Sequence, residues 1–227
     1  MTTIASNLQA IHTAIAASAH EAGRDLADIT LLAVSKNFPA DSIRVAYHAG
    51  QLRYAENYLQ EALAKMGALH ELPLEWHFIG PIQSNKTRAI AENFSWVHSV
   101  DRLIIAERLS AQRPAHLPPL QVCIQVNISG EASKSGASAE SALQLAIRVA
   151  QLPRLQLRGL MAVPAPSNDL QEQRKSFAAL RELLARLNQH GLLLDTLSMG
   201  MTHDYAAAIM EGSTMLRIGT AIFGNRT

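Results

Sequence analysis

Cysteine and net charge are the two things that this sequence has least of. Cysteine occurs once among 227 residues, as Cys123 inside an apolar run, so no disulfide can form within the chain. This is typical of a protein from a reducing compartment, in which Cys123 fills part of the core. The formal net charge is +1, which gives no support to nucleic-acid or anionic-membrane binding by bulk electrostatics.

Long hydrophobic runs and targeting signals are missing as well. No stretch approaches the ~20 consecutive apolar residues that a membrane span needs. The N-terminal residues lack the basic start and the long apolar segment of a signal peptide. We therefore expect a cytoplasmic protein with no membrane partner. The nine histidines show no metal-ligand spacing, so we also expect no metal site.

What is present is a regular alternation of strand-like and helix-like segments. Helical spacing and good capping residues fill most of the gaps between the strand-like runs. Eight strands alternating with helices predict an α/β fold, a single (β/α)8 TIM-barrel domain over residues 1–227. The alternative is an open doubly wound sheet, which usually has fewer strands and a glycine-rich first turn. The predicted strands cover residues 29–36, 52–57, 75–80, 95–101, 120–128, 155–164, 194–200 and 214–219.

The C-terminal end departs from the regular pattern. Only eight residues follow the last predicted strand, which is too short for a normal outer helix of a barrel. An extra N-terminal helix over about residues 6–22 is predicted to cover this gap in the helical ring.

Polar residues gather at the predicted strand ends, where barrels of this kind bind their ligands. Lys36 ends the first predicted strand, where its ammonium must reach water, find an anion or lose its proton. The loops after the seventh and eighth strands begin "SMGMTHD" and "RIGTAIFG". Both loops offer small residues and hydroxyls that suit a phosphate. A lysine beside such a pocket suits a phosphorylated aldehyde held as a Schiff base, and pyridoxal 5′-phosphate (PLP) is the leading candidate.

Three longer segments carry a family resemblance. They are "WHFIGPIQSNKTRAI" (76–90), "QVNISGEASKSG" (125–136) and "LSMGMTHDYAAAIMEGSTMLRIGTAIFG" (197–224). They resemble the signature segments of the pyridoxal phosphate homeostasis proteins, the YggS/PROSC family, and the similarity runs from about residue 31 to residue 226. The resemblance implies a barrel like the N-terminal domain of alanine racemase. It also implies a protein that binds PLP and, like the members of this family, has no established enzymatic activity.

The resemblance also implies roles for individual residues. Lys36 matches the Schiff-base lysine, Arg217 would face the pyridine nitrogen, and Asn57 would lie beside the ring. Thr202 stands where the family usually has serine, which keeps the hydroxyl and adds a methyl group. The residues that would hold the phosphate, partly through backbone N–H groups, are Ser198, Thr202, Gly219 and Thr220.

Arg217 bears on whether the chain is an enzyme. An arginine cannot readily give up a proton, so it should leave the pyridine nitrogen unprotonated and the cofactor a weak electron sink. In the racemase relatives a second base comes from an additional C-terminal domain, which we do not expect here because the sequence stops at Thr227. We therefore expect a non-catalytic carrier that stores, protects or delivers PLP. Other candidates for a base, each expected to be a packing or rim residue, are Tyr54, Tyr58, His77 and Tyr205.

Two other functions stay open at this point. One is a single-domain, PLP-dependent racemase-like enzyme with Lys36 as one of its bases. The other is an interaction protein for which the cofactor is only a signal. For the carrier, we expect a monomer that passes PLP to PLP-dependent apoenzymes.

Two polar segments are expected near the barrel mouth. Residues 129–137, with Glu131 and Lys134, form either a loop over the mouth or a solvated turn. Lys86 and Arg88 follow the third strand and could attract an anionic ligand.

Overall fold

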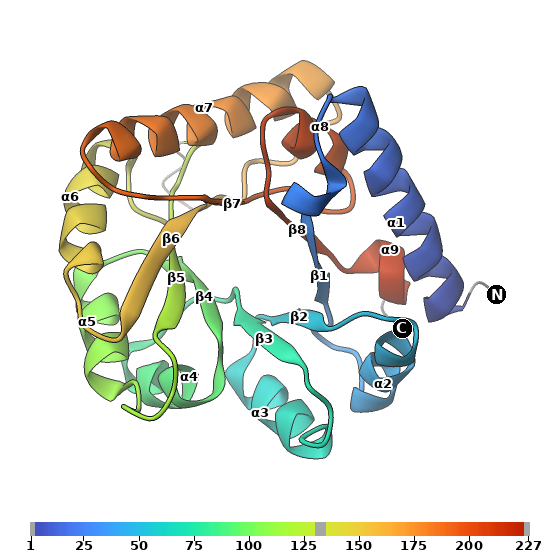
Figure 1. Ribbon diagram of the computed structural model, residues 1–227, viewed down its shortest axis with the longest axis horizontal. Helices are drawn as coiled ribbons and strands as arrows, with labels where there is room; N and C mark the ends of the chain where they lie inside the picture. Colours follow the sequence, from blue (N-terminus) through green and yellow to red (C-terminus); the bar gives the residue numbers. More distant parts are fainter. Residues whose placement is uncertain (1–2, 130–134, 225–227) are drawn as a thin grey trace.

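The computed structural model describes residues 3–129 and 135–224, and its centre is a closed barrel of eight parallel strands (Figure 1). The strands pair in sequence order, and β8 pairs back with β1. This confirms the predicted fold and excludes the open doubly wound sheet. The strands are β1 Thr30–Val34, β2 Arg53–Glu56, β3 Glu75–Phe78, β4 Trp96–Val100, β5 Leu120–Gln125, β6 Leu155–Met161, β7 Thr196–Ser198 and β8 Met215–Ile218.

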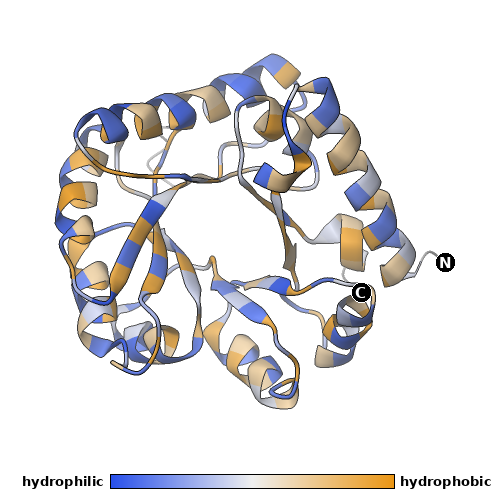
Figure 2. Ribbon diagram, in the orientation of Figure 1, coloured by the Kyte–Doolittle hydropathy of each residue, from blue (hydrophilic) through white to orange (hydrophobic). Residues whose placement is uncertain are grey.

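Helices surround the barrel as an outer ring (Figure 1). Hydrophobic and hydrophilic residues alternate along most of them (Figure 2), as expected of helices that bury one face. In the described ranges, no helix is both long and apolar enough to cross a membrane. The helices are α1 Ile4–Glu21, α2 Ala40–His48, α3 Leu59–Ala68, α4 Thr87–Asn93, α5 Leu103–Gln112, α6 Ala139–Ala150, α7 Leu170–Gln189, α8 Tyr205–Met210 and α9 Thr220–Phe223, with short 3₁₀ turns at η1 Leu26–Asp28 and η2 Ser84–Lys86.

Side chains of each strand alternate between two cores because successive residues of a strand point to opposite faces. In β1, Leu31 and Ala33 pack in the outer core between strands and helices. Their neighbours Leu32 and Val34 pack in a second cluster inside the barrel. The interior cluster is small, and polar side chains share the interior with it.

The N-terminal helix covers the gap that the short C-terminal end leaves in the ring, as predicted. Helix α9 has only four residues, and α1 lies alongside both α8 and α9 (Figure 1). The Asn7 side-chain amide donates to the Ile222 carbonyl at 2.9 Å. Arg24, which follows α1, donates to the carbonyl oxygens of Ile209 and Ser213. Helix α1 therefore takes the place of a full eighth outer helix.

Several strands are shorter than predicted. The paired part of β5 ends at Gln125 and that of β7 spans three residues, although buried apolar residues continue beyond both strands. Lys36 likewise lies two residues past β1, in a turn, and not within the strand. Single hydrogen bonds to the neighbouring strands continue past the ends of β5 and β7, since the Val126 N–H donates to the Met161 carbonyl at 2.8 Å and the Met199 N–H to the Met215 carbonyl at 3.2 Å.

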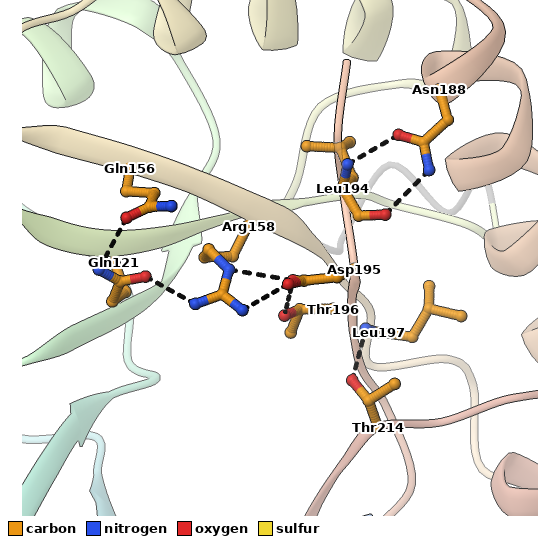
Figure 3. Close-up of polar contacts among 9 residues, drawn as sticks. All are labelled: Gln121, Gln156, Arg158, Asn188, Leu194, Asp195, Thr196, Leu197 and Thr214. Atoms are coloured by element: carbon orange, nitrogen blue, oxygen red, sulfur yellow. Dashed lines mark hydrogen bonds and ion pairs between the residues drawn. The ribbon is translucent and has the colours of Figure 1, made fainter. Parts of the chain in front are cut away.

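An arginine joins several strands near the N-terminal end of the barrel (Figure 3). The Arg158 guanidinium binds the Asp195 carboxylate through two nitrogens, at 3.0 and 2.5 Å. It also donates to the Gln121 side-chain oxygen at 2.9 Å and lies over the Trp96 ring at 5.4 Å from the ring centre. These contacts join β4, β5, β6 and the start of β7.

Candidate functional site

A cavity of about 320 Å³ opens at the C-terminal end of the barrel, a size typical of small-molecule sites. It lies between the end of β1, the end of β2, strand β8 and the loop after β7. Its apolar lining includes Val34, Phe38, Ile79 and Met161. The predicted site residues that line it are Lys36, Asn57, Thr202, Arg217, Gly219 and Thr220.

Lys36 lies in a tight turn that follows β1. The Phe38 N–H donates to the Ser35 carbonyl at 3.0 Å, and Asn37 has a φ of 65°. A positive φ at the third position of a four-residue turn favours glycine or asparagine, which explains the "SKNF" sequence. The turn reverses the chain and places Lys36 on the cavity wall.

A buried ion network fixes the two peptide units on either side of Lys36. The Lys65 ammonium on α3 contacts Glu56, Glu61 and the Ser35 carbonyl, at 2.6, 2.6 and 2.7 Å. Glu61 also accepts the Asn37 N–H at 2.5 Å. The network therefore holds the residue before Lys36 and the residue after it.

Glu56 is the buried anion of this network. Its side chain is fully buried, and the Ser35 hydroxyl donates to it at 2.6 Å. Burial raises the pKa of Glu56, and the hydrogen bonds from Lys65 and Ser35 act in the opposite direction. Because the carboxylate is out of water, Lys65 is the charge that keeps it ionised.

Asn57 has an unpaired oxygen beside the cavity. Its Oδ1 is buried and has no hydrogen-bond partner among the described residues. Gly80 comes close to the same residue, because a Cβ added at Gly80 would lie 2.0 Å from the Asn57 carbonyl oxygen. Glycine at the end of "HFIG" therefore allows the chain after β3 to pack against Asn57. Its side-chain oxygen is left free to accept a hydrogen bond from a ligand.

Arg217 is a buried cation at the bottom of the cavity. Only 4% of the residue is exposed, and its Nη1 and Nη2 donate to the Ser198 hydroxyl at 2.7 Å and to the Ala162 carbonyl at 2.8 Å. Burial lowers the pKa of Arg217 to about 10. The guanidinium therefore stays positive at neutral pH, and its partners are neutral groups.

Ser198 is placed differently from the other predicted residues. It is fully buried and is not among the residues that line the cavity. Its hydroxyl accepts from Arg217 and contacts His98 Nδ1 at 2.8 Å. A direct phosphate contact would require this hydroxyl to leave both partners. In the structure, the Ser198 hydroxyl is thus a hydrogen-bond partner of Arg217. Sequence spacing could not show this contact.

Two loops bring hydroxyl and glycine residues to the opposite side of the cavity. In the loop after β7, the Met201 N–H donates to the Asp204 carboxylate at 2.5 Å, which shapes the turn that carries Thr202. After β8, Phe223 stacks on Phe38 with ring centres 5.0 Å apart, which ties Thr220 and α9 to the Lys36 turn. Asp204 and Phe38 were not singled out from the sequence, because only their contacts reveal their roles.

The residues that the sequence suggested as second bases do not line the cavity. Tyr54 is buried in the outer core and donates to the carbonyl oxygens of Ile43 and Gln51. His77 is buried inside the barrel, below the cavity. His203, to which no role was assigned, does line the cavity, and it is exposed at the rim.

Some expected features lie elsewhere or outside the described residues. Residues 130–134, which include Glu131 and Lys134, fall in the part that the structure does not describe. Lys86 ends η2 and Arg88 lies 3.8 Å from Glu92 on α4, and neither residue lines the cavity. Among the described residues, no group of three or more histidine, cysteine, aspartate or glutamate side chains could hold a metal ion.

The buried ion network predicts a large stability effect from one substitution. Lys65→Met leaves Glu56 buried and unpaired, which should lower the free energy of unfolding by about 3–5 kcal/mol. Adding Glu56→Leu removes the uncompensated charge, so the double variant should recover more than half of the loss. Urea titrations followed by circular dichroism measure both. Arg44→Met is the matched control, because the Arg44–Glu71 pair is exposed and should contribute little. If Lys65→Met and Arg44→Met lowered the free energy of unfolding equally, the buried Lys65–Glu56 pair would not have the stabilising role that we assign to it.

Comparison with known proteins identifies the family of the chain. A family model described as the alanine racemase N-terminal domain matches residues 6–227. The chain is 61% identical over 226 residues to the pyridoxal phosphate homeostasis protein of Pseudomonas aeruginosa, with 100% of this chain and 97% of the relative covered. It is 52% identical over 229 residues to the protein of the same name from Escherichia coli K12, with 100% and 98% covered.

A solved structure is similar over the same length. PipY of Synechococcus elongatus with PLP bound has a TM-score of 0.86 and 36% sequence identity, and the match covers 98% of this chain and 100% of PipY. The sequence matches and the structural match each cover nearly the whole chain. The chain therefore belongs to the pyridoxal phosphate homeostasis protein family, whose barrel is that of the alanine racemase N-terminal domain.

Proposed function

We propose that this chain binds PLP as a Schiff base on Lys36 and serves as a non-catalytic carrier that stores, protects or delivers the cofactor. The observation that carries the proposal is the composition of one cavity. It combines Lys36, hydroxyl and glycine residues of two loops, a buried cation and an unpaired amide oxygen. This donor set fits a molecule with an aldehyde, a phosphate and an aromatic ring. A relative with PLP bound supports the choice of ligand.

Lys36 would supply the covalent attachment. Its neutral amine would bond to the aldehyde carbon of the ligand, and the aldehyde oxygen would be released as water that takes both amine hydrogens. This reaction is reversible by water, so it suits a protein that must release its ligand. The Lys65 network serves it by fixing the turn that carries Lys36.

Thr202, Gly219 and Thr220 would hold the phosphate. All three line the cavity on the side that the loops after β7 and β8 form. A Cβ added at Gly219 would lie 3.1 Å from the Val34 carbonyl oxygen, so this segment packs tightly against the end of β1 and brings the phosphate side close to Lys36. Hydroxyl and backbone N–H donors bind phosphate oxygens well because the acceptor is charged. Ser198 would act through Arg217, since its hydroxyl is already bonded there.

Arg217 and Asn57 would contact the ring. A guanidinium has donors and no acceptor, so Arg217 would donate to the ring nitrogen and leave it unprotonated. PLP supplies an electron sink when its nitrogen is protonated, and this arrangement weakens that chemistry. The Asn57 Oδ1, which has no partner among the described residues, would accept a hydrogen bond from a hydroxyl on the ring.

A carrier fits the cavity better than an enzyme does. The titratable side chains among its described lining residues are Lys36, His203 and Arg217. Arg217 does not exchange protons readily, and His203 is exposed at the rim, which leaves Lys36 as the one sheltered amine. The relatives at 52–61% identity are named homeostasis proteins. We propose that residues 1–227 act as one cytoplasmic, monomeric PLP-binding domain that serves PLP-dependent apoenzymes.

The attachment site is tested by reducing the PLP-loaded protein with borohydride and mapping peptides by mass spectrometry. We expect a pyridoxyl adduct on the peptide that contains Lys36 and no such adduct in Lys36→Ala. Lys175→Ala is the matched control, because Lys175 is exposed on α7, and it should keep the adduct. An adduct on another lysine, or none in the wild type, would refute covalent binding at Lys36.

The phosphate contacts are tested with isosteric substitutions. Thr202→Val and Thr220→Val should each weaken PLP binding roughly tenfold, because each removes a hydroxyl donor to a charged oxygen. Neither should change the affinity for pyridoxal, which has no phosphate. Thr13→Val, on the exposed side of α1, controls for the loss of a hydroxyl elsewhere. Fluorescence titration gives the affinities, and equal losses for both ligands would argue against these roles.

The carrier is separated from the racemase-like enzyme by exchange of the α-proton of amino acids in deuterated water. We expect the PLP-loaded protein to exchange no faster than free PLP at the same concentration, because the described residues that line the cavity include no second sheltered base. Proton NMR of a panel of amino acids follows the exchange. Faster exchange that disappears in Lys36→Ala would show that the protein is an enzyme.

A further inference from the structure

Five polar side chains form a continuous hydrogen-bonded chain through the barrel interior, which we call the interior chain. The Glu75 carboxylate contacts His77 Nε2 at 2.8 Å, and His77 Nδ1 contacts His98 Nε2 at 2.9 Å. His98 Nδ1 contacts the Ser198 hydroxyl at 2.8 Å, and Ser198 accepts from Arg217 at 2.7 Å. The interior chain therefore runs from β3 through β4 and β7 to β8 and ends at the cavity.

The two ends of the interior chain lie at opposite ends of the barrel, and its middle is buried. His77, His98 and Ser198 are fully buried. The Glu75 side chain is 39% exposed and lies 3.3 Å from Arg53 at the N-terminal end of the barrel. Arg217 lines the cavity at the other end. The interior chain thus connects the two ends of the barrel through residues that lie far apart in the sequence.

The charges at the two ends determine the position of every hydrogen between them. Arg217 can only donate, so the Ser198 oxygen accepts from it and the Ser198 hydrogen is free to go to His98 Nδ1. His98 then carries its hydrogen on Nε2 and donates to His77 Nδ1. His77 in turn carries its hydrogen on Nε2 and donates to the Glu75 carboxylate, which can only accept when ionised.

The opposite orientation is disfavoured at the Glu75 end. It would place the bare Nε2 lone pair of His77 against the carboxylate, where two acceptors would repel each other. A charged imidazole is disfavoured too, since burial lowers the pKa of His77 and His98, and the neighbouring Arg217 lowers that of His98 further. Trp96 stacks on His77 at 5.4 Å with the rings 12° apart, which holds the plane of the ring.

We propose that Glu75, His77 and His98 are positioning residues for Arg217, acting through the oriented interior chain that ends at Ser198. Because the Ser198 hydrogen goes to His98, its oxygen lone pair stays directed at Arg217 Nη1, while the Ala162 carbonyl holds Nη2. The guanidinium plane is then fixed before any ligand arrives. The proposal rests on the proposed function only in taking PLP as the ligand that Arg217 meets.

A purely structural role does not account for this arrangement. The other side chains of the barrel interior include Leu32, Val34 and Met215, so apolar residues pack well at this depth. Burying two imidazoles and a hydroxyl costs free energy unless each finds a partner. The interior chain provides one partner for each ring nitrogen, and it ends at the buried Arg217, whose side chain donates to the Ser198 hydroxyl and the Ala162 carbonyl.

The orientation is tested on the ligand-free protein by long-range proton–nitrogen correlation NMR of ¹⁵N-histidine-labelled protein. We expect both His77 and His98 to be neutral at pH 7, with hydrogen on Nε2 and a bare Nδ1. Single His77→Gln and His98→Gln variants assign the signals. A hydrogen on Nδ1 of either ring, or a doubly protonated ring, would overturn the proposal. This measurement is decisive whether or not the protein binds PLP.

The action over distance is tested at the exposed end of the interior chain. Glu75→Leu should mix the two histidine tautomers, shift the absorption band of bound PLP and weaken PLP binding roughly tenfold, as loss of a hydrogen bond to a charged group does. Glu75→Gln keeps an acceptor oxygen and should restore the spectrum. Glu71→Leu removes an exposed carboxylate that pairs with Arg44 and should change neither readout. Unchanged tautomers and absorption in Glu75→Leu would refute the proposal, whereas a wild type that binds no PLP would refute the proposed function.

Discussion

The pairing of β1 with β8 is the interaction on which the site depends. Leu32 lies opposite Arg217 and Ala33 opposite Ile218 in this ladder, which closes the sheet and joins the two ends of the sequence. Because all eight strands are parallel, their C-terminal ends meet at one rim. The turn that carries Lys36 therefore lies beside the segment that carries Gly219 and Thr220. Without this closure the two halves of the cavity would be far apart.

Two buried polar systems then lead to the two basic side chains of the cavity wall, Lys36 and Arg217. The Lys65 network holds the peptide units around Lys36, and the interior chain leads to Arg217. Buried charges are costly unless they are paired and hydrogen-bonded. In the first system a carboxylate, Glu56, supplies the pairing. In the second, the hydrogen-bond partners of Arg217 are the neutral Ser198 hydroxyl and Ala162 carbonyl, and the charge of the Asp204 carboxylate raises the pKa of Arg217 against the larger effect of burial.

Much of the fold and part of the site could be predicted from the sequence because both depend on local pattern. The alternation of apolar strands with capped helices predicted the barrel, and the short end after the last strand predicted the covering role of α1. Lys36 stood out because a lysine at the end of an apolar strand needs an explanation. The loops after β7 and β8 stood out because small residues and hydroxyls followed two strands, a pattern that predicted a phosphate site. Ser198 was grouped with them by spacing alone, although its hydroxyl points to Arg217 and His98.

The sequence by itself determined the order of the elements, the family resemblance and the identity of the residue types at the strand ends. Only the tertiary structure decided which of those residues share a cavity and which bond to one another inside the barrel. Glu75, His77, His98, Ser198 and Arg217 come from four strands, and their contacts depend on the register of the closed sheet. The alternating pattern of a strand predicts that a given side chain faces inward. The pattern does not predict which other inward-facing side chain that residue contacts, because the contact depends on how the strands are staggered around the barrel.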